Sequence, residues 1–345
     1  MGGANNLGVL YSITTAGAVT VLHSFAGGSD GEYPYGPPIQ ATDGNFYGAT
    51  AGAPDTSNPA TIYQLTSTGV YSVIFTFSQS TTGVGVFGLV QGSDGLLYAT
   101  ANVGGAYNDG TIVKLTTTGV LKGTHTFNSD DDGDHGPTYP IAIPMLASNG
   151  TLYGTTQDGG TSNGGVLYYI SSAFGINTPY NFSGDGTNPN AGLVEGNDGN
   201  LYGVSYTFPE IYSWNLSGGT YHALASLGEG EFIATLMQDT NGIFYGVSEI
   251  YGTHSDGYVF SFSNGLSPFV AFVKPRGAVG GSAEILGQGL TGTTSVTFNG
   301  ISASFTVVSD TYMTATVPTG ATTGPVVVTT PTGPLTSNKS FTITE

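Results

Sequence analysis

The sequence lacks cysteine altogether, and this absence removes disulfide bonds, thiolate catalysis and cysteine-based zinc sites from consideration. Cations are nearly as scarce, since only five of the 345 residues are Lys or Arg and the formal net charge is −18. A nucleic-acid-binding protein neutralises phosphates with clustered cations, so this class of function is excluded. Attraction to anionic lipid headgroups is excluded for the same reason.

Long apolar runs and helical periodicity are also missing. No apolar run approaches membrane-spanning length, so membrane insertion is not expected, and no basic and apolar export signal follows Met1. Charged residues make up only 8% of the chain, against about 25% in an average domain. Gly, Thr, Ser, Tyr and Phe dominate what remains. This composition favours an all-β fold with many tight turns.

One short pattern occurs five times: an Asp-Gly or Asn-Gly pair with a Tyr four residues after the Asp or Asn. Spacings of 43 to 55 residues separate the copies, and a period of this size with several short strands is typical of a β-propeller. The pair predicts a two-residue type I′ hairpin turn, and the recurrent Tyr is expected to pack between blades. The Tyr positions are Tyr47, Tyr98, Tyr153, Tyr202 and Tyr245.

Each unit is expected to contribute four strands, with the turn between the first and the second. Five such hairpins favour five blades over roughly residues 37–273. There are, however, six third-strand segments, because residues 8–25 supply an extra hairpin, so six blades are also allowed. This hairpin either closes the ring by pairing with the last blade or is the remnant of a sixth. The chain begins in mid-repeat, which suggests a longer array.

The repeated unit resembles a known family. The pattern "GxVFxLTxxGxxxxLxSFxGGxDGxxPxxxLxxxxDGNxYGxT" is similar to the GloVer tandem repeat of bacterial surface or secreted proteins, and the resemblance covers residues 1–266. The second and fifth units depart from it in "SQSTTGVGV" and "LGEGEF". The resemblance implies an extracellular or cell-surface location and no particular reaction.

Composition shifts after Pro268, where short strands alternate with Gly/Pro turns in the manner of a small β-sandwich. Residues 268–345 resemble the IPT/TIG immunoglobulin-like domain in "GLTG", "SVTFNG", "TATVP", "GPVVVTT" and "SFTI". The resemblance implies a spacer, an oligomerisation surface or a companion to glycan-active modules. The expected architecture is therefore a β-propeller followed by an Ig-like β-sandwich.

The two ends of the expected blades differ in character. One end carries only minimal turns, whereas the loops at the opposite end are longer and irregular and hold most of the acidic residues. Loops that vary on a rigid scaffold are where function usually resides. Three hypotheses for this long-loop end remain open, beside a scaffolding or purely structural surface role that requires no chemistry there.

The first hypothesis is binding of a polysaccharide or cell-surface polymer, in which Tyr rings stack on sugars while polar groups bind hydroxyls. The candidate binding residues are Glu32, Tyr33, Tyr35, His135, Tyr139, Tyr206, Tyr251 and His254.

The second hypothesis is glycoside hydrolysis, which requires two carboxylates separated by roughly 5–9.5 Å. The candidate catalytic residues are Asp30, Asp134, Asp185 and Glu231.

The third hypothesis is calcium binding by "SDDDGDHG", which packs hard oxygen ligands densely but is not an EF-hand loop. The candidate metal ligands are Asp130, Asp132 and Asp134. An alternative for every acid is an ordinary turn or a solubilising surface charge. His23, His125 and His222 are expected to be packed residues of fourth strands, and Trp214 a core residue of a third strand.

Overall fold

The structure is a computed structural model that describes residues 2–14, 16–52, 58–129, 136–184, 187–207, 209–228, 234–250, 254 and 256–344. Its contacts divide the chain into two compact units. The first comprises Met1–Leu193, Tyr202–Thr235 and Ser248–Gly257, and the second comprises Val194–Leu201, Leu236–Val247 and Tyr258–Glu345. The all-β prediction is confirmed, since the described residues form strands and a single 3₁₀ turn, Gly28–Asp30.

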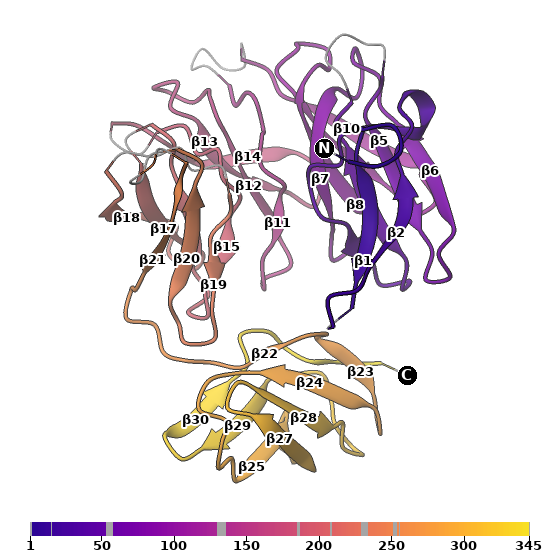
Figure 1. The fold of residues 1–345 in the computed structure, drawn as a ribbon. Helices are drawn as coiled ribbons and strands as arrows, with labels where there is room; N and C mark the ends of the chain where they lie inside the picture. Colours follow the sequence, from indigo (N-terminus) through magenta and orange to yellow (C-terminus); the bar gives the residue numbers. More distant parts are fainter. Residues whose placement is uncertain are drawn as a thin grey trace. The chain divides into compact units, whose positions relative to one another are not determined.

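Four sheets each contain four strands in chain order, the strand order of a propeller blade (Figure 1). Their strands are β3 Ile39–Gln40, β4 Phe46–Thr50, β5 Thr61–Leu65 and β6 Tyr71–Thr76; β7 Val84–Gln91, β8 Leu97–Val103, β9 Thr111–Leu115 and β10 Leu121–Thr126; β11 Met145–Leu146, β12 Leu152–Thr156, β13 Val166–Ile170 and β14 Ile176–Asn181; and β15 Val194–Glu195, β16 Leu201–Val204, β17 Glu210–Asn215 and β18 Thr220–Ser226.

Two further sheets are shorter in the described part of the chain. The fifth repeat forms three strands, β19 Met237–Gln238, β20 Phe244–Ser248 and β21 Tyr258–Phe262. The extra hairpin forms a sheet of its own from β1 Val9–Ile13 and β2 Val19–Ser24, visible as the indigo pair in Figure 1. The six predicted third strands are thus present, as β1, β5, β9, β13, β17 and β21. Whether this hairpin belongs to a fifth or a sixth blade stays a prediction.

The prediction of two-residue type I′ turns is wrong. In the first repeat Gly44 N donates to Ala41 O and Ala41 N to Asn45 O, which makes a three-residue loop. Gly44 has a φ of 85°, but Asp43 stays at negative φ. The Asp43 carboxylate instead accepts a hydrogen bond from Asn45 N at 3.0 Å. This local side-chain bond favours a three-residue turn with only the Gly left-handed.

All five copies of the turn share this side-chain bond. The acceptor is Oδ1 of the Asp or Asn, and the donor is the amide two residues later, over distances of 2.8 to 3.2 Å. The recurrent Tyr is hydrogen-bonded to the same turn residue. The Tyr47 hydroxyl donates to Asp43 Oδ2 at 2.7 Å, and the Tyr98 hydroxyl donates to Asp94 Oδ2 at 2.8 Å. Where the residue is Asn, its amide donates to the Tyr hydroxyl instead, as Asn149 does to Tyr153. The expected structural role of these tyrosines is confirmed.

Neighbouring second and third strands are matched in size. Gly48 lies opposite Tyr63, and a Cβ at Gly48 would overlap the Tyr63 hydroxyl. Gly154 and Tyr168 repeat this contact. In the second repeat the third-strand residue is a smaller Val, and Ala replaces Gly opposite it. The glycine is thus required wherever the ring is present.

Residues beyond 268 form two main sheets around one apolar cluster, which includes Ile285, Met313, Phe298 and Val328. One sheet has the order β22–β24–β28–β27 and the other β26–β25–β29–β30, while β23 pairs with β31 in parallel. The strands are β22 Ala271–Phe272, β23 Arg276–Ala278, β24 Ser282–Leu286, β25 Ser295–Phe298, β26 Ile301–Ser302, β27 Phe305–Ser309, β28 Tyr312–Thr316, β29 Val326–Thr330, β30 Gly333–Thr336 and β31 Thr342–Thr344.

The turn predicts a pH effect. Burial raises the pKa of Asp43, but hydrogen bonds from the Tyr47 hydroxyl and the Asn45 amide outweigh it and leave the pKa below its ordinary 3.8. The resulting stability is present above pH 3.8 and is lost as the pH falls through the folded-state pKa. Asp43→Asn, which copies the turns at Asn149 and Asn241, should therefore fold and lose less stability than the wild type between pH 7 and pH 3. Urea titration at both pH values measures this, and an unchanged loss would contradict it.

The glycine opposite the ring predicts a steric effect. Gly154→Ala places a methyl group against the buried Tyr168 ring, and such overpacking should lower the free energy of unfolding by about 1–3 kcal/mol. Gly175→Ala is the matched control, because the nearest atom to its added Cβ is Ser171 Oγ at 3.4 Å. Equal urea midpoints for the two variants would show that the ring yields to the methyl group.

Candidate functional site

The loops between second and third strands at the long-loop end are more regular than expected. In three of them the Gly that precedes the third strand donates its N–H to a Gly six residues earlier: Gly8 to Gly2, Gly110 to Gly104 and Gly165 to Gly159. Each loop also holds a left-handed Asn, at Asn6, Asn108 and Asn163. The prediction of irregular loops is therefore wrong for 2–8, 104–110 and 159–165, which repeat one turn.

Three successive backbone segments meet at each of three places at this end, which we call the rim junctions. In the first, Tyr33 N donates to Leu7 O and Ala51 N donates to Tyr33 O. In the second junction Tyr139 N donates to Asp109 O, and Gln157 N donates to Tyr139 O. In the third junction the central residue is Asn188, whose carbonyl accepts from Tyr206 N. Three of the predicted sugar-binding residues, Tyr33, Tyr139 and Tyr206, thus belong to equivalent junctions.

The central residue of each rim junction has a left-handed backbone and precedes a proline. The φ angles are 56° at Tyr33, 55° at Tyr139 and 58° at Asn188. Asn adopts this conformation at little cost, but a bulky aromatic residue is an outlier there and strains the backbone by about 1–3 kcal/mol. Two of the three rim junctions therefore hold a half-buried Tyr in a backbone conformation that is unfavourable for Tyr.

Asp30, the one predicted catalytic acid among the described residues, is held by its neighbours. His23 Nε2 lies 3.0 Å from Oδ2 and 3.1 Å from Oδ1, and Ala26 N donates to Oδ2 at 2.8 Å. The His23 ring stacks on Tyr71 with centroids 3.6 Å apart and meets Phe25 edge-on. The packing expected for His23 is confirmed. Its contacts with Asp30, together with the bond from Ala26 N, hold the Asp30 carboxylate in place within the loop.

Glu32 lies deeper in the same loop and is only 3% exposed. Asn58 Nδ2 donates to its Oε2 at 3.0 Å, while Asn58 Oδ1 accepts from Gly28 N at 2.9 Å. Asn58 therefore connects the buried carboxylate to the 3₁₀ turn. At this depth Glu32 supports the loop rather than offering an exposed oxygen to a polymer.

Tyr33 and Tyr35 are brought together on the surface of this loop. Their rings are stacked with centroids 6.3 Å apart and planes 25° from parallel, and Tyr35 is 66% exposed. With Pro34, Leu7 and Val9 they line a hollow of about 240 Å³. This is the one pair of predicted binding rings whose contact the structure shows within the described residues.

Sequence reasoning missed a group of polar side chains at the third rim junction, whose Asn188 carbonyl accepts from Tyr206 N. Asn188 Nδ2 donates to Asp158 Oδ1 at 2.9 Å, and Thr207 Oγ1 donates to Asn188 Oδ1 at 2.9 Å. Burial raises the pKa of Asp158, although the Asn188 bond opposes the shift. The signal was present in the sequence, because Asn188-Pro189 stands where other repeats have Tyr33-Pro34 and Tyr139-Pro140.

Most of the remaining predicted residues lie outside the described ranges. Among those that the structure does describe, His254 is exposed. The packing expected for His125 and Trp214 is confirmed, since His125 meets Phe127 edge-on and Trp214 is buried in β17. The packing expected for His222 is wrong, because this side chain is exposed on the fourth strand β18. Within the described ranges no three His, Asp or Glu side chains are grouped as metal ligands. The predicted residues outside those ranges are Asp130, Asp132, Asp134, His135, Asp185, Glu231 and Tyr251.

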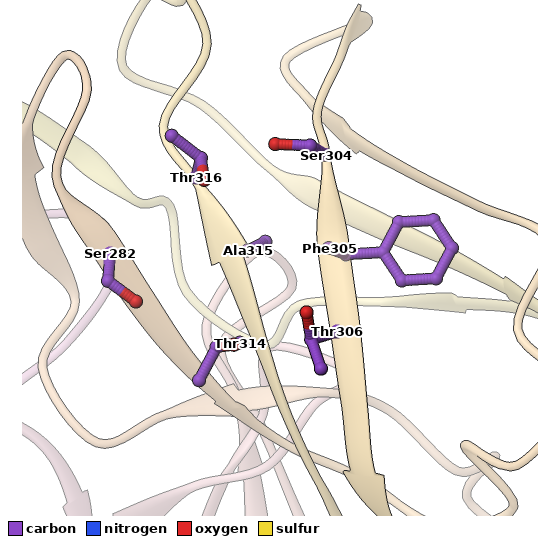
Figure 2. A pocket seen from close by; sticks show the side chains of 7 residues that line it. All are labelled: Ser282, Ser304, Phe305, Thr306, Thr314, Ala315 and Thr316. Atoms are coloured by element: carbon purple, nitrogen blue, oxygen red, sulfur yellow. The ribbon is translucent and has the colours of Figure 1, made fainter.

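Two other hollows contain no predicted site residue. One, of about 290 Å³, lies at the short-turn end beside Asp94, Tyr98 and Lys114, where the Lys114 ammonium sits 4.4 Å from the Phe174 ring centre. The other, of about 110 Å³, is lined by Ser and Thr side chains of β24, β27 and β28 with Phe305 (Figure 2). A cavity of this size admits only a few water molecules.

A known repeat family matches most of the chain, in agreement with its repeated structure. The sequence profile of the Gloeobacter/Verrucomicrobia repeat matches residues 1–138 and residues 88–308. The chain belongs to this family. The second match continues into the C-terminal sheets as far as residue 308. No curated protein matches the chain.

Solved structures share the fold of this repeat protein. A streptogramin B lyase aligns over 76% of the chain and 78% of its own length, with a TM-score of 0.51 and 14% identity. A fungal alcohol oxidase of the AA5 family in complex with copper aligns over 99% of the chain and 82% of its own, with a TM-score of 0.55 and 12% identity. These likenesses support a β-propeller, and at such identities they show the fold alone. In the described residues no helix is long and apolar enough to span a membrane.

The buried carboxylate predicts a stability effect. Asn58→Ala removes a donor to Glu32 inside the protein and should lower the free energy of unfolding by about 1–3 kcal/mol, because an unpaired buried acceptor is costly. Adding Glu32→Gln to this variant should recover part of the loss, since the uncharged amide is cheaper to bury. Denaturant unfolding of the single and double variants measures both effects. A loss that Glu32→Gln does not reduce would show that the Gly28 bond carries it.

Proposed function

We propose that this repeat protein is an extracellular binding or scaffolding module for a polysaccharide or other surface polymer, and that its rim junctions carry the binding. The observation that supports this is the left-handed Tyr at residues 33 and 139, where the equivalent Asn188 satisfies the same backbone without strain. Strain of this kind is commonly kept at functional positions. Repeated tyrosines suit a ligand that is itself built of repeating units.

The chemistry around the rings fits a sugar polymer. Tyr rings stack on the apolar faces of pyranoses, and nearby amide, hydroxyl and carboxylate groups bind ring hydroxyls. Asn188, Thr207 and Asp158 provide such groups at the third rim junction. An extracellular location agrees with the surface-protein character of the repeat family. Calcium and catalytic carboxylates remain predictions that rest on the loops containing Asp134, Asp185 and Glu231.

We further propose that residues 268–345 form an IPT/TIG immunoglobulin-like domain that acts as a spacer. Two sheets that enclose one apolar cluster support this assignment. Within the second unit this segment is joined to the fifth repeat, since Phe269 N donates to Thr240 O at 2.9 Å.

Affinity electrophoresis of the whole protein in gels containing plant and microbial polysaccharides tests the proposal. Tyr33→Asn and Tyr139→Asn should keep or raise the thermal midpoint, because Asn accepts the left-handed backbone, yet reduce retardation by about tenfold in affinity as a stacking ring is lost. Tyr312→Asn in the C-terminal sheets is the matched control and should leave retardation unchanged.

The outcomes of this experiment distinguish a binding module, a scaffold and an enzyme. Retardation that survives both rim substitutions would overturn the rim as the binding surface. An absence of retardation in every gel would leave scaffolding alone. Oligosaccharides released from the polymer, read by mass spectrometry, would show an enzyme instead.

A further inference from the structure

A pocket between the sheets of the second and third repeats, which we call the Lys114 pocket, lies wholly within the first unit. Its volume of about 290 Å³ suits a ligand the size of one sugar, since drug-sized ligands occupy about 300–1,000 Å³. Charged and hydroxyl-bearing residues line it together: Lys114, Asp94, Ser93, Thr151, Ser171 and Ser172. It belongs to the short-turn end, away from the rim junctions.

The ammonium group of Lys114 is held over an aromatic ring but is not neutralised by an acid. Lys114 and Lys122 are the only Lys or Arg residues before residue 268. Asp94 lines the same pocket, yet its Oδ1 accepts from a turn amide and its Oδ2 from the Tyr98 hydroxyl. The one ion pair found among the described residues lies elsewhere. Lys114 is therefore available to a ligand, with its Nζ 4.4 Å from the centre of the Phe174 ring.

Phe174 occupies a position that is Gly in the equivalent turns. Each of these turns is closed by an N–H that donates to the carbonyl three residues earlier, and the donors are Gly17, Gly69, Gly119 and Phe174. The φ of Phe174 is 64°, so a bulky ring residue takes a left-handed backbone that is unfavourable for it. Gly123 leaves room for this ring, because a Cβ there would lie 3.1 Å from two ring carbons. Such strain is commonly kept at functional positions.

The Lys114 pocket lies where a contact between neighbouring repeats is missing. Between the first and second repeats the Gln91 side chain accepts from a turn amide of the preceding repeat and donates to the Gly carbonyl of its own turn, both at 2.9 Å. Gln238 makes the same two bonds between the fourth and fifth repeats. Leu146 stands at this position in the third repeat and can make neither bond. The residues that a Gln would connect there, Ser93 and Gly150, line the pocket instead.

These groups together select a class of ligand. A carboxylate suits the ammonium group of Lys114, because a charge-assisted hydrogen bond is stronger than a neutral one. Asp94 repels a second negative charge but accepts hydrogen bonds from hydroxyl groups, and the Ser and Thr side chains can donate or accept. A hexuronic acid carries one carboxylate and several hydroxyl groups on a single ring, and it therefore matches both parts of the lining.

We propose that the Lys114 pocket binds a hexuronic acid, whose carboxylate pairs with Lys114 and whose hydroxyl groups bond to Asp94 and to the surrounding Ser and Thr side chains. This site is separate from the rim junctions and does not depend on a polymer bound there. The strained Phe174 holds the ammonium group in place, and Leu146 leaves the space for the ligand.

Isothermal titration calorimetry of the full chain with sodium D-galacturonate tests the proposal. D-Galactose lacks the carboxylate and acetate lacks the hydroxyl groups, so each should bind at least about tenfold more weakly than galacturonate. Lys114→Gln copies Gln64 of the first repeat, which donates to the Tyr47 hydroxyl at 2.7 Å, and should therefore fold. It should weaken galacturonate binding at least about tenfold. Lys122→Gln is the matched control, because Lys122 is exposed on β10, and should leave binding unchanged.

A second variant tests the position of the site without removing a residue that lines it. Leu146→Gln restores the side chain that Gln91 and Gln238 provide, so it should fill the space beside Ser93 and weaken galacturonate binding at least about tenfold. Thermal melting checks that each variant is folded. Binding that survives Lys114→Gln or Leu146→Gln in a folded protein would overturn the proposal. Equal binding of galactose or acetate, or no saturable heat at millimolar galacturonate, would overturn it as well.

Discussion

The structure depends on the contact between a tyrosine ring on a third strand and a glycine on the second strand beside it. The missing Cβ lets the ring lie flat across its neighbour, as at Gly48 and Tyr63, and the buried ring then fills the space toward the preceding hairpin, where it meets Phe25. The Tyr63 ring therefore connects its own sheet, through Gly48, to the preceding hairpin, through Phe25.

The two ends of the sheets obtain their order from different sources. At the short-turn end an Asp or Asn side chain holds the loop and receives or gives a bond to the recurrent Tyr, so that the turn is closed by its own residues. At the other end order comes from backbone bonds between segments distant in sequence, as between Tyr33, Leu7 and Ala51. Some side chains also support the loops there, as Asn58 and Glu32 do, while the residue at the centre of the rim junctions varies between Tyr and Asn.

Acidic residues fall into several physical classes once their neighbours are known. Asp30 is committed to His23 and a backbone amide, Glu32 is buried against Asn58, and Asp43 stabilises a turn. The sequence placed most acidic residues at the long-loop end without separating their roles, but these three carboxylates have unrelated structural roles. The rim tyrosines are a better guide to function, because their backbone conformation is unfavourable for the residue that occupies it.

The sequence by itself determined the all-β class, the repeat and its period, the six third strands and the structural role of the recurrent Tyr, because these follow from local alternation and from a motif repeated within one chain. It misjudged the turn type, since Asp-Gly suits two turns and the Asp43–Asn45 bond decides between them. Only the tertiary structure showed that Glu32 is buried, that Asp30 is bound by His23, and that Asn188 is equivalent to Tyr33 and Tyr139. These features depend on partners distant in sequence, which no local pattern specifies.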